Sequence, residues 1–165
     1  MRQFATFMLG RSLLGIEVLL VREINRLMGI TPVPHCPQYV KGLINLRGHV
    51  ATILDLGVRL NLKTAGSGQP HQVILKTNDE LAPIRAAWNR IDLITCADTA
   101  GFVVDEIRDV VEVDDRDIEP LPVGKEVAGA EFLRGVVQLN GKLLSLLDLE
   151  RILKTDATSA SCRAA

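Results

Sequence analysis

Few residues in this chain have the types and spacing that enzyme or metal chemistry requires. His35 precedes Cys36, yet adjacent residues in a Pro-rich loop seldom aim at each other, and no third group is evident to orient a base. The histidines His35, His49 and His71 lack the spacing of metal ligands, and the sequence contains no CxxC pair. We therefore predict neither a nucleophilic catalytic site nor a metal site.

Asp55 and Asp148 are the remaining candidates, because paired carboxylates can act as general acid and base. Both follow a short apolar run, in "ATILDL" and "LLSLLDL". A repeated structural role, such as accepting backbone hydrogen bonds at the end of a strand, explains this placement better. The sequence accordingly predicts no enzymatic activity and no cofactor.

Composition and charge narrow the function classes further. The chain has 165 residues, of which 47% are hydrophobic and 4% aromatic, so one domain or two very small ones must have an aliphatic core. A net charge of -1 without a basic stripe argues against nucleic acid as a partner. No apolar run approaches the roughly 20 residues of a membrane span, and Met1–Gly10 lacks the pattern of a signal peptide. We expect a cytoplasmic protein with no direct membrane insertion.

An internal repeat organises the chain. Tyr39–Leu56, "YVKGLINLRGHVATILDL", aligns without a gap with Phe132–Leu149, "FLRGVVQLNGKLLSLLDL". Two further pairs occur in the same order in both halves, "GIEVLLVREI" with "GFVVDEIRDV" and "ITPVP" with "IEPLP". Three matches in one order indicate a duplication.

Each half has the pattern of β structure, because its aliphatic runs are short and are punctuated by Gly, Pro, Asn and Asp. Asn140-Gly141 suits a type I′ turn, and the alignment carries this turn onto Arg47-Gly48. The alignment therefore places Arg47 at the tip of a hairpin, where a positive φ is costlier for Arg than for Asn. Two explanations stay open on these residues: an exposed Arg that the turn tolerates, or an Arg held at a rigid tip for a partner.

The two repeats predict two small barrels, because closure removes the exposed edges of a small sheet. We expect one barrel over about residues 1–65 and a second over about residues 72–153. The Pro-rich segments 31–39 and 119–132 are predicted to be crossing loops. Residues 155–165 are small and polar and are predicted to be a disordered tail.

Residues 78–94 break the symmetry, because the first half has no counterpart. Asp79 is the predicted N-cap of a helix that has Pro83 near its first turn. One face of this helix would carry Ile84, Ala87, Trp88 and Ile91. We expect that face to pack on the second barrel as a lid that shelters Trp88, since an exposed apolar face is an aggregation liability.

The strand before Gly101 is ambiguous. Either Gln72–Thr77, "QVILKT", or Leu93–Ala97, "LITCA", could supply it. A gapless alignment with "FMLGRSLLG" places Leu93 opposite Phe7 and favours the second segment.

The motifs together resemble the CheW-type chemotaxis coupling proteins. The resemblance runs from Phe4 to about Leu153, except for residues 78–94, and its most specific segments are "KGLINLRG" and "GFVVDEIRDV". It implies a mainly β fold of two packed five-stranded SH3-like barrels. It also implies a non-enzymatic adaptor that joins the cytoplasmic tips of chemoreceptors to the histidine kinase CheA.

The resemblance further implies a receptor-binding groove between the barrels, with an apolar floor and a charged pair at its lip. Carried over to this sequence, its residues are Val21, Glu23, Ile24, Arg47, Gly48, Ile107 and Val110. Glu23 and Arg47 have the charges for a salt bridge that orients Arg47. The alternative function is a generic SH3-like module that binds a peptide or another signalling partner outside chemotaxis. A small-molecule enzyme domain would need a polar constellation that the sequence does not contain.

Overall fold

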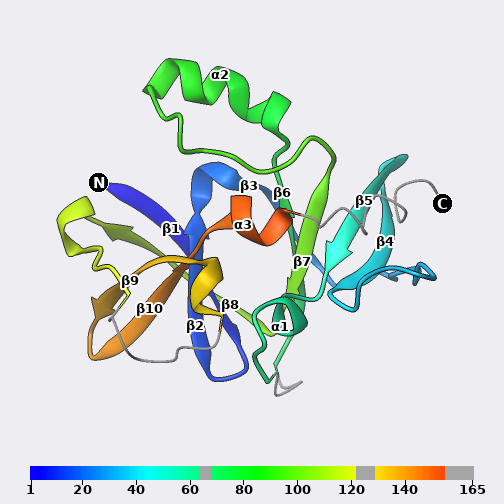
Figure 1. The fold of residues 1–165 in the computed structure, drawn as a ribbon, viewed down its shortest axis with the longest axis horizontal. Coiled ribbons are helices and arrows are strands. Elements are labelled where there is room, and N and C mark those ends of the chain that lie inside the picture. The colour runs from blue at the N-terminus through cyan, green and yellow to red at the C-terminus, as the bar shows by residue number, and fades with distance from the viewer. Residues whose placement is uncertain (64–67, 122–128, 155–165) are drawn as a thin grey trace.

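Two five-stranded sheets form the body of the protein (Figure 1). The computed structural model describes residues 1–63, 68–121 and 129–154. One sheet has the order β8-β1-β2-β10-β9, and we call it the terminal barrel; its strands are β1 (Arg2–Leu9), β2 (Ser12–Glu17), β8 (Glu106–Val113), β9 (Leu133–Leu139) and β10 (Lys142–Leu147). The other has the order β3-β6-β7-β5-β4, and we call it the central barrel; its strands are β3 (Val21–Arg26), β4 (Val40–Leu46), β5 (His49–Leu54), β6 (His71–Leu75) and β7 (Ala100–Val104).

Short helices connect the strands. The α-helices are α1 (Leu56–Arg59), α2 (Asn78–Trp88) and α3 (Leu149–Leu153). Single 3₁₀ turns lie at η1 (Val18–Leu20), η2 (Asp115–Asp117) and η3 (Ala130–Phe132). The predicted tail at residues 155–165 lies outside the described residues.

The barrels are not successive in the sequence, and the predicted boundaries at about residues 1–65 and 72–153 are wrong. The terminal barrel takes two strands from the start of the chain and three from its end, while the central barrel takes the five strands between. The chain crosses between barrels inside the repeated segment itself, at η1 after β2 and at Asp105 after β7. Each repeat therefore supplies strands to both barrels, and the parallel pairs β2–β10 and β5–β7 join the two halves.

Both predicted hairpin turns are confirmed. Arg47 and Gly48 have φ values of 54° and 84°, and Asn140 and Gly141 have 45° and 78°. Positive φ at both central residues is the requirement of a type I′ turn, whose twist matches that of the flanking strands. Arg47 therefore occupies a turn position that Asn fills in the other copy.

The structural role predicted for the two aspartates is also confirmed. Asp55 Oδ1 accepts a hydrogen bond from the Val58 backbone N–H at 3.1 Å, and Asp148 Oδ1 accepts one from Arg151 N–H at 3.2 Å. Each aspartate is thus the N-cap of the short helix that follows its hairpin, α1 or α3.

The repeated Pro-rich segments lie against the hairpins. Thr31 pairs with Leu43 on β4, and Glu119 pairs with Val136 on β9. A Cβ at Gly42, whose φ is 151°, would lie 2.3 Å from the Thr31 carbonyl oxygen. Glycine is therefore required at this point of close backbone approach, which explains its presence in the most specific motif.

One apolar core serves both barrels. It contains Phe7 and Ile16 from the terminal barrel together with Phe102 and Leu75 from the central barrel, all at most 1% exposed. The rings of Phe7 and Phe102 lie 5.5 Å apart, centroid to centroid. This burial crosses the barrel boundary, so it packs the two barrels together. Each barrel also has a smaller buried cluster of its own, around Phe4 in the terminal barrel and Ile44 in the central barrel.

The strand that precedes β7 is β6, so the preference for Leu93–Ala97 is wrong. In β6, Val73 pairs with Phe102 and Ile74 with Gly101. The gapless alignment fails because residues 76–99 separate β6 from β7, whereas the equivalent strands β1 and β2 are joined by Gly10 and Arg11 alone.

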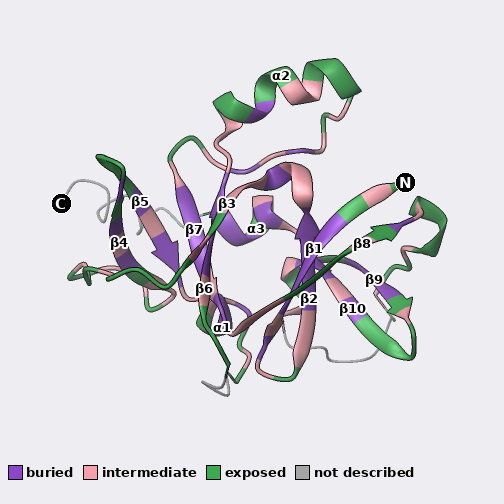
Figure 2. Cartoon of the chain, turned by 180° about the vertical axis from the view of Figure 1, so that it is seen from behind, coloured by how far each residue is buried: buried purple, intermediate pink, exposed green. Residues whose placement is uncertain are grey.

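The helix of the insertion forms, but its predicted cap and packing are wrong. Thr77, not Asp79, is the N-cap, and Thr77 and Glu80 form a reciprocal capping box. Leu81 is fully buried, whereas Trp88 is 69% exposed and Ile91 82% exposed. Leu81 and Trp88 are seven residues apart and share a helical face, so only the first turns of α2 reach the core (Figure 2).

Arg59 joins the two halves at α1 and α3. Its guanidinium donates hydrogen bonds to the carbonyl oxygens of Ile152 at 3.1 Å and Lys154 at 2.7 Å. It also lies 4.2 Å from the ring centroid of Tyr39 and 4.7 Å from that of Phe132, which are equivalent residues of the repeat. One planar cation therefore contacts both copies and satisfies the end of α3.

We predict that Arg59→Ala lowers the free energy of unfolding by about 1–3 kcal/mol, because charged hydrogen bonds and two ring contacts are lost together. Arg59→Lys should recover only part of this, since an ammonium cannot stack as a plane. Urea unfolding followed by circular dichroism measures the change. The control is Arg116→Ala, whose side chain is 88% exposed. A loss for Arg59→Ala that matches the control would contradict this role.

Trp88, the only tryptophan of the chain, should be accessible to solvent in the isolated protein. We expect acrylamide to quench its fluorescence nearly as efficiently as that of free tryptophan, and Trp88→Ala to leave the free energy of unfolding almost unchanged, within about 0.5 kcal/mol. Strongly protected fluorescence would restore the lid that the sequence predicts.

Candidate functional site

The seven residues expected to bind a receptor occupy two edge strands and one hairpin tip. β3, at one end of the central barrel's sheet, carries Val21, Glu23 and Ile24, and β8, at one end of the terminal barrel's sheet, carries Ile107 and Val110. Arg47 and Gly48 form the β4–β5 turn. β3 and β8 are equivalent strands of the repeat, and in Figure 2 each contains both exposed and half-buried residues.

Glu23 and Arg47 are brought together as predicted. Arg47 Nη2 donates to Glu23 Oε2 at 2.8 Å. The Arg47 side chain is 77% exposed and that of Glu23 only 17%. The half-buried Glu23 thus fixes the exposed Arg47, whose guanidinium stays largely open to solvent.

Two asparagines hold this pair in place. Asn45 Oδ1 accepts a hydrogen bond from the Gly48 backbone N–H at 2.9 Å, which braces the turn from below Arg47. Asn25 Nδ2 donates to Glu23 Oε1 at 3.2 Å, so both carboxylate oxygens of Glu23 are occupied. The sequence analysis did not select Asn25 or Asn45, although an Asn three residues before a turn glycine is a recognisable Asx signal.

The pair also bridges the two ends of one sheet. β3 and β4 lie at opposite ends of the order β3-β6-β7-β5-β4, yet Glu23 on β3 reaches the tip of the β4–β5 hairpin. The sheet must therefore curl on itself, and the Glu23–Arg47 contact lies across the closure.

The apolar residues divide into two equivalent pairs. Val21 and Ile107 are half-buried and pack against the core that both barrels share. Ile24 and Val110 are 38% and 58% exposed. The structure thus connects β3 and β8 through the shared core and leaves one large apolar residue of each strand open to solvent.

A cavity of about 530 Å³ lies elsewhere on the central barrel and was missed by the sequence analysis. Its lining includes Tyr39, Leu43, Val50, Thr99 and Leu153, which come from distant parts of the chain. No pattern in one segment could have indicated it. Its mainly apolar wall suits an apolar side chain better than a charged substrate.

The described ranges contain no group of three or more His, Cys, Asp or Glu residues that could hold a metal ion. Within these same ranges, no helix is both long and apolar enough to cross a membrane.

Comparison with known proteins places these features in a family. The model of the CheW-like domain matches residues 3–157. The chain is 31% identical over 160 residues to the chemotaxis protein CheW of Rhizobium meliloti (strain 1021), covering 97% of this chain and 92% of that protein. It is 30% identical to the chemotaxis protein CheW of Bacillus subtilis (strain 168), with 94% and 88% covered, and 29% identical to protein FrzA of Myxococcus xanthus, with 98% and 91% covered.

A solved structure agrees with the fold. The scaffolding protein TtCheW from Thermoanaerobacter tengcongensis superposes with a TM-score of 0.76 at 22% sequence identity, covering 94% of this chain and 89% of that chain. The predicted class of two packed five-stranded SH3-like barrels is thereby confirmed. Since the family match spans nearly the whole length, the chain belongs to the CheW-like domain family.

Proposed function

We propose that this protein is a non-enzymatic adaptor that couples the cytoplasmic tips of chemoreceptors to the histidine kinase CheA. Its family membership and the chemotaxis names of its relatives support this function. The structural neighbour is named a scaffolding protein, which agrees with a role in assembly and not in catalysis. The protein would act in the cytoplasm and be recruited to receptor arrays at the membrane.

The observation that carries the receptor half of this proposal is the geometry of Arg47. An exposed Arg is held at a turn position with φ 54° by a carboxylate that is itself largely buried. The other copy of the turn uses Asn140, so the fold does not require Arg there. A residue that is worse for the turn, yet oriented by a second side chain, is best explained by recognition of a partner.

The receptor would dock through a helix laid on Ile24, Val110 and Arg47. Apolar anchors with a charged group at one side are the usual pattern for an amphipathic helix bound in a groove. Ile24 and Val110 supply exposed apolar positions from the two barrels, and Arg47 supplies a cation that can pair with a receptor carboxylate. The kinase would then contact other strand edges and loops of both barrels.

A single experiment separates this function from its alternative. The purified protein is sedimented with membranes that contain full-length chemoreceptor, with and without CheA. Pelleting with receptor alone, together with receptor-dependent pelleting of CheA, supports the adaptor. A folded protein that stays in the supernatant with several receptors and CheA would instead support an SH3-like module for a peptide partner outside chemotaxis.

Arg47→Asn should preserve the fold and weaken receptor binding. Asn tolerates this φ, and an exposed ion pair contributes only about 0–1 kcal/mol to folding, so the melting temperature should hardly change. Loss of a charged hydrogen bond to the receptor should weaken binding about tenfold or more. The control is Arg11→Asn at the tip of the β1–β2 hairpin, which should pellet like wild type. Unchanged binding of Arg47→Asn would remove Arg47 from the site.

Ile24→Asp should abolish receptor association while leaving CheA binding intact. The substitution places a charge where an apolar contact would be desolvated, and it costs folding little because Ile24 is exposed. Val58→Asp is the matched control, since Val58 is 42% exposed and lies on α1 in the central barrel. Equal loss of both partners from a folded Ile24→Asp variant would show that this surface is not specific to the receptor.

A further inference from the structure

Residues 76–99 are dispensable for closing a barrel. In the terminal barrel the equivalent strands β1 and β2 are joined by Gly10 and Arg11 only, and their sheet is complete. The longer connection of the central barrel contains α2 and then returns beneath it to β7 (Figure 1). Since closing the sheet does not require this connection, its role is inferred from the residues that it contacts.

The first part of this connection is fixed to the central barrel. Glu80 completes the capping box with Thr77 and also accepts hydrogen bonds from Arg22 on β3, one of them from Nε at 3.1 Å. These hydrogen bonds from Arg22 hold the pKa of Glu80 below its usual value. Leu81 is fully buried in the core. The insertion follows β6 and is hydrogen-bonded to β3, the edge strand that carries Ile24.

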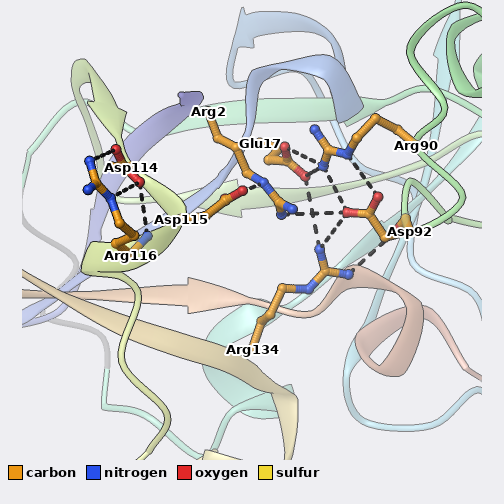
Figure 3. Close-up of polar contacts among 8 residues, drawn as sticks. All are labelled: Arg2, Glu17, Arg90, Asp92, Asp114, Asp115, Arg116 and Arg134. Atoms are coloured by element: carbon orange, nitrogen blue, oxygen red, sulfur yellow. Dashed lines mark hydrogen bonds and ion pairs between the residues drawn. The ribbon is translucent and has the colours of Figure 1, made fainter.

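The second part is fixed to the terminal barrel (Figure 3). Arg90 Nη2 lies 2.7 Å from each carboxylate oxygen of Glu17, at the end of β2. Asp92 lies 3.6 Å from Arg2 on β1 and 3.4 Å from Arg134 on β9. Hydrogen bonds from Arg90 lower the pKa of the Asp92 carboxyl well below its usual range, and Asp92 raises the pKa of Arg90. Three strands of the terminal barrel are therefore tied to the insertion.

Glu17, the residue that Arg90 binds, is buried and lies where the chain crosses between the barrels. Glu17 is only 4% exposed, so its charge is costly without Arg90. It is also the residue directly before η1, where the chain crosses from the terminal barrel to the central barrel. Arg90 therefore binds the terminal barrel at the point where the chain crosses between barrels. The exposed ion pair Arg116–Asp114, by contrast, joins residues of one turn only (Figure 3).

We propose that residues 76–99 form a strap that fixes the orientation of the two barrels and so sets the spacing between the edge strands β3 and β8. The second half of this proposal rests on the proposed function, because β3 and β8 carry the receptor contacts. The strap acts at a distance from those contacts: Arg90 positions the barrels and does not touch the receptor.

The strap is tested first by a distance measurement that needs no partner. Spin labels are introduced as unnatural amino acids at Val50 on β5 and Leu143 on β10, which are equivalent residues, 63% and 53% exposed, one on each barrel. Pulsed electron resonance then gives the distribution of distances between barrels. In the double variant Glu17→Gln/Arg90→Ala, which unlatches the strap without leaving a buried charge, the distribution should broaden or shift. Arg116→Ala should leave it unchanged.

A milder variant covers the case in which the double variant does not fold. Asp92→Asn removes the charge that faces Arg2 and Arg134 while Glu17 and Arg90 stay paired, and it should broaden the distribution to a smaller extent. Wild-type distributions in the folded variants would overturn the strap.

Receptor binding tests the second half. Sedimentation with receptor membranes should show an affinity about fivefold or more below that of wild type for the unlatched variant, in the usual range for coupling between sites. Broadened distances with wild-type receptor affinity would overturn the link between strap and receptor surface. Failure of the wild-type protein to bind receptor would overturn the proposed function, and the distance measurement would still decide the strap.

Discussion

The fold depends on an apolar core that belongs to neither barrel alone. Phe7 on β1 and Phe102 on β7 come from different barrels, and their ring centroids lie 5.5 Å apart. Each barrel alone has only a small buried cluster, and domains of this size are marginally stable. The shared core adds buried apolar area to both barrels, so it stabilises them together. The same burial packs the two barrels against each other as one body.

Against this near-symmetric body, three departures from the repeat stand out, and each joins elements that the symmetry would leave separate. Arg59 stands where the second copy has Ile152, and it contacts both α3 and the aromatic pair. Arg47 stands where the second copy has Asn140, and it reaches across the closure to Glu23. Residues 76–99 stand where the other barrel has a two-residue turn. In two of these departures a cation is held by a less exposed carboxylate: Arg47 by Glu23, and Arg90 of residues 76–99 by Glu17. Such a partner orients a side chain more firmly than a second exposed charge would.

The sequence predicted the local features well because their causes are local. The turn at Asn140-Gly141 follows from the φ that the turn demands, and Asp55 follows from the need of a helix N-terminus for an acceptor. The composition of the barrels was not predictable in the same way, since the parallel pairs β2–β10 and β5–β7 join residues far apart in the chain. Periodicity predicted the helix α2 and its apolar face. It could not show that the last turn of this helix, with Trp88, extends beyond the packed core.

In the candidate site, too, some contacts could be expected from the sequence and others could not. The charge pair of Glu23 and Arg47 was expected from the family resemblance and from the opposite charges of the two residues. The network around Glu17 was not expected, because its members come from β1, β2, β9 and the insertion. The edge strands β3 and β8 also combine exposed apolar residues with charges. In "VREINR" and "EIRDVVEV" charged residues flank Ile24 and Val110. Such charges discourage edge-to-edge pairing between copies of a sheet. Ile24 and Val110 stay exposed among these charges, so each edge strand presents one large apolar residue without a continuous apolar edge.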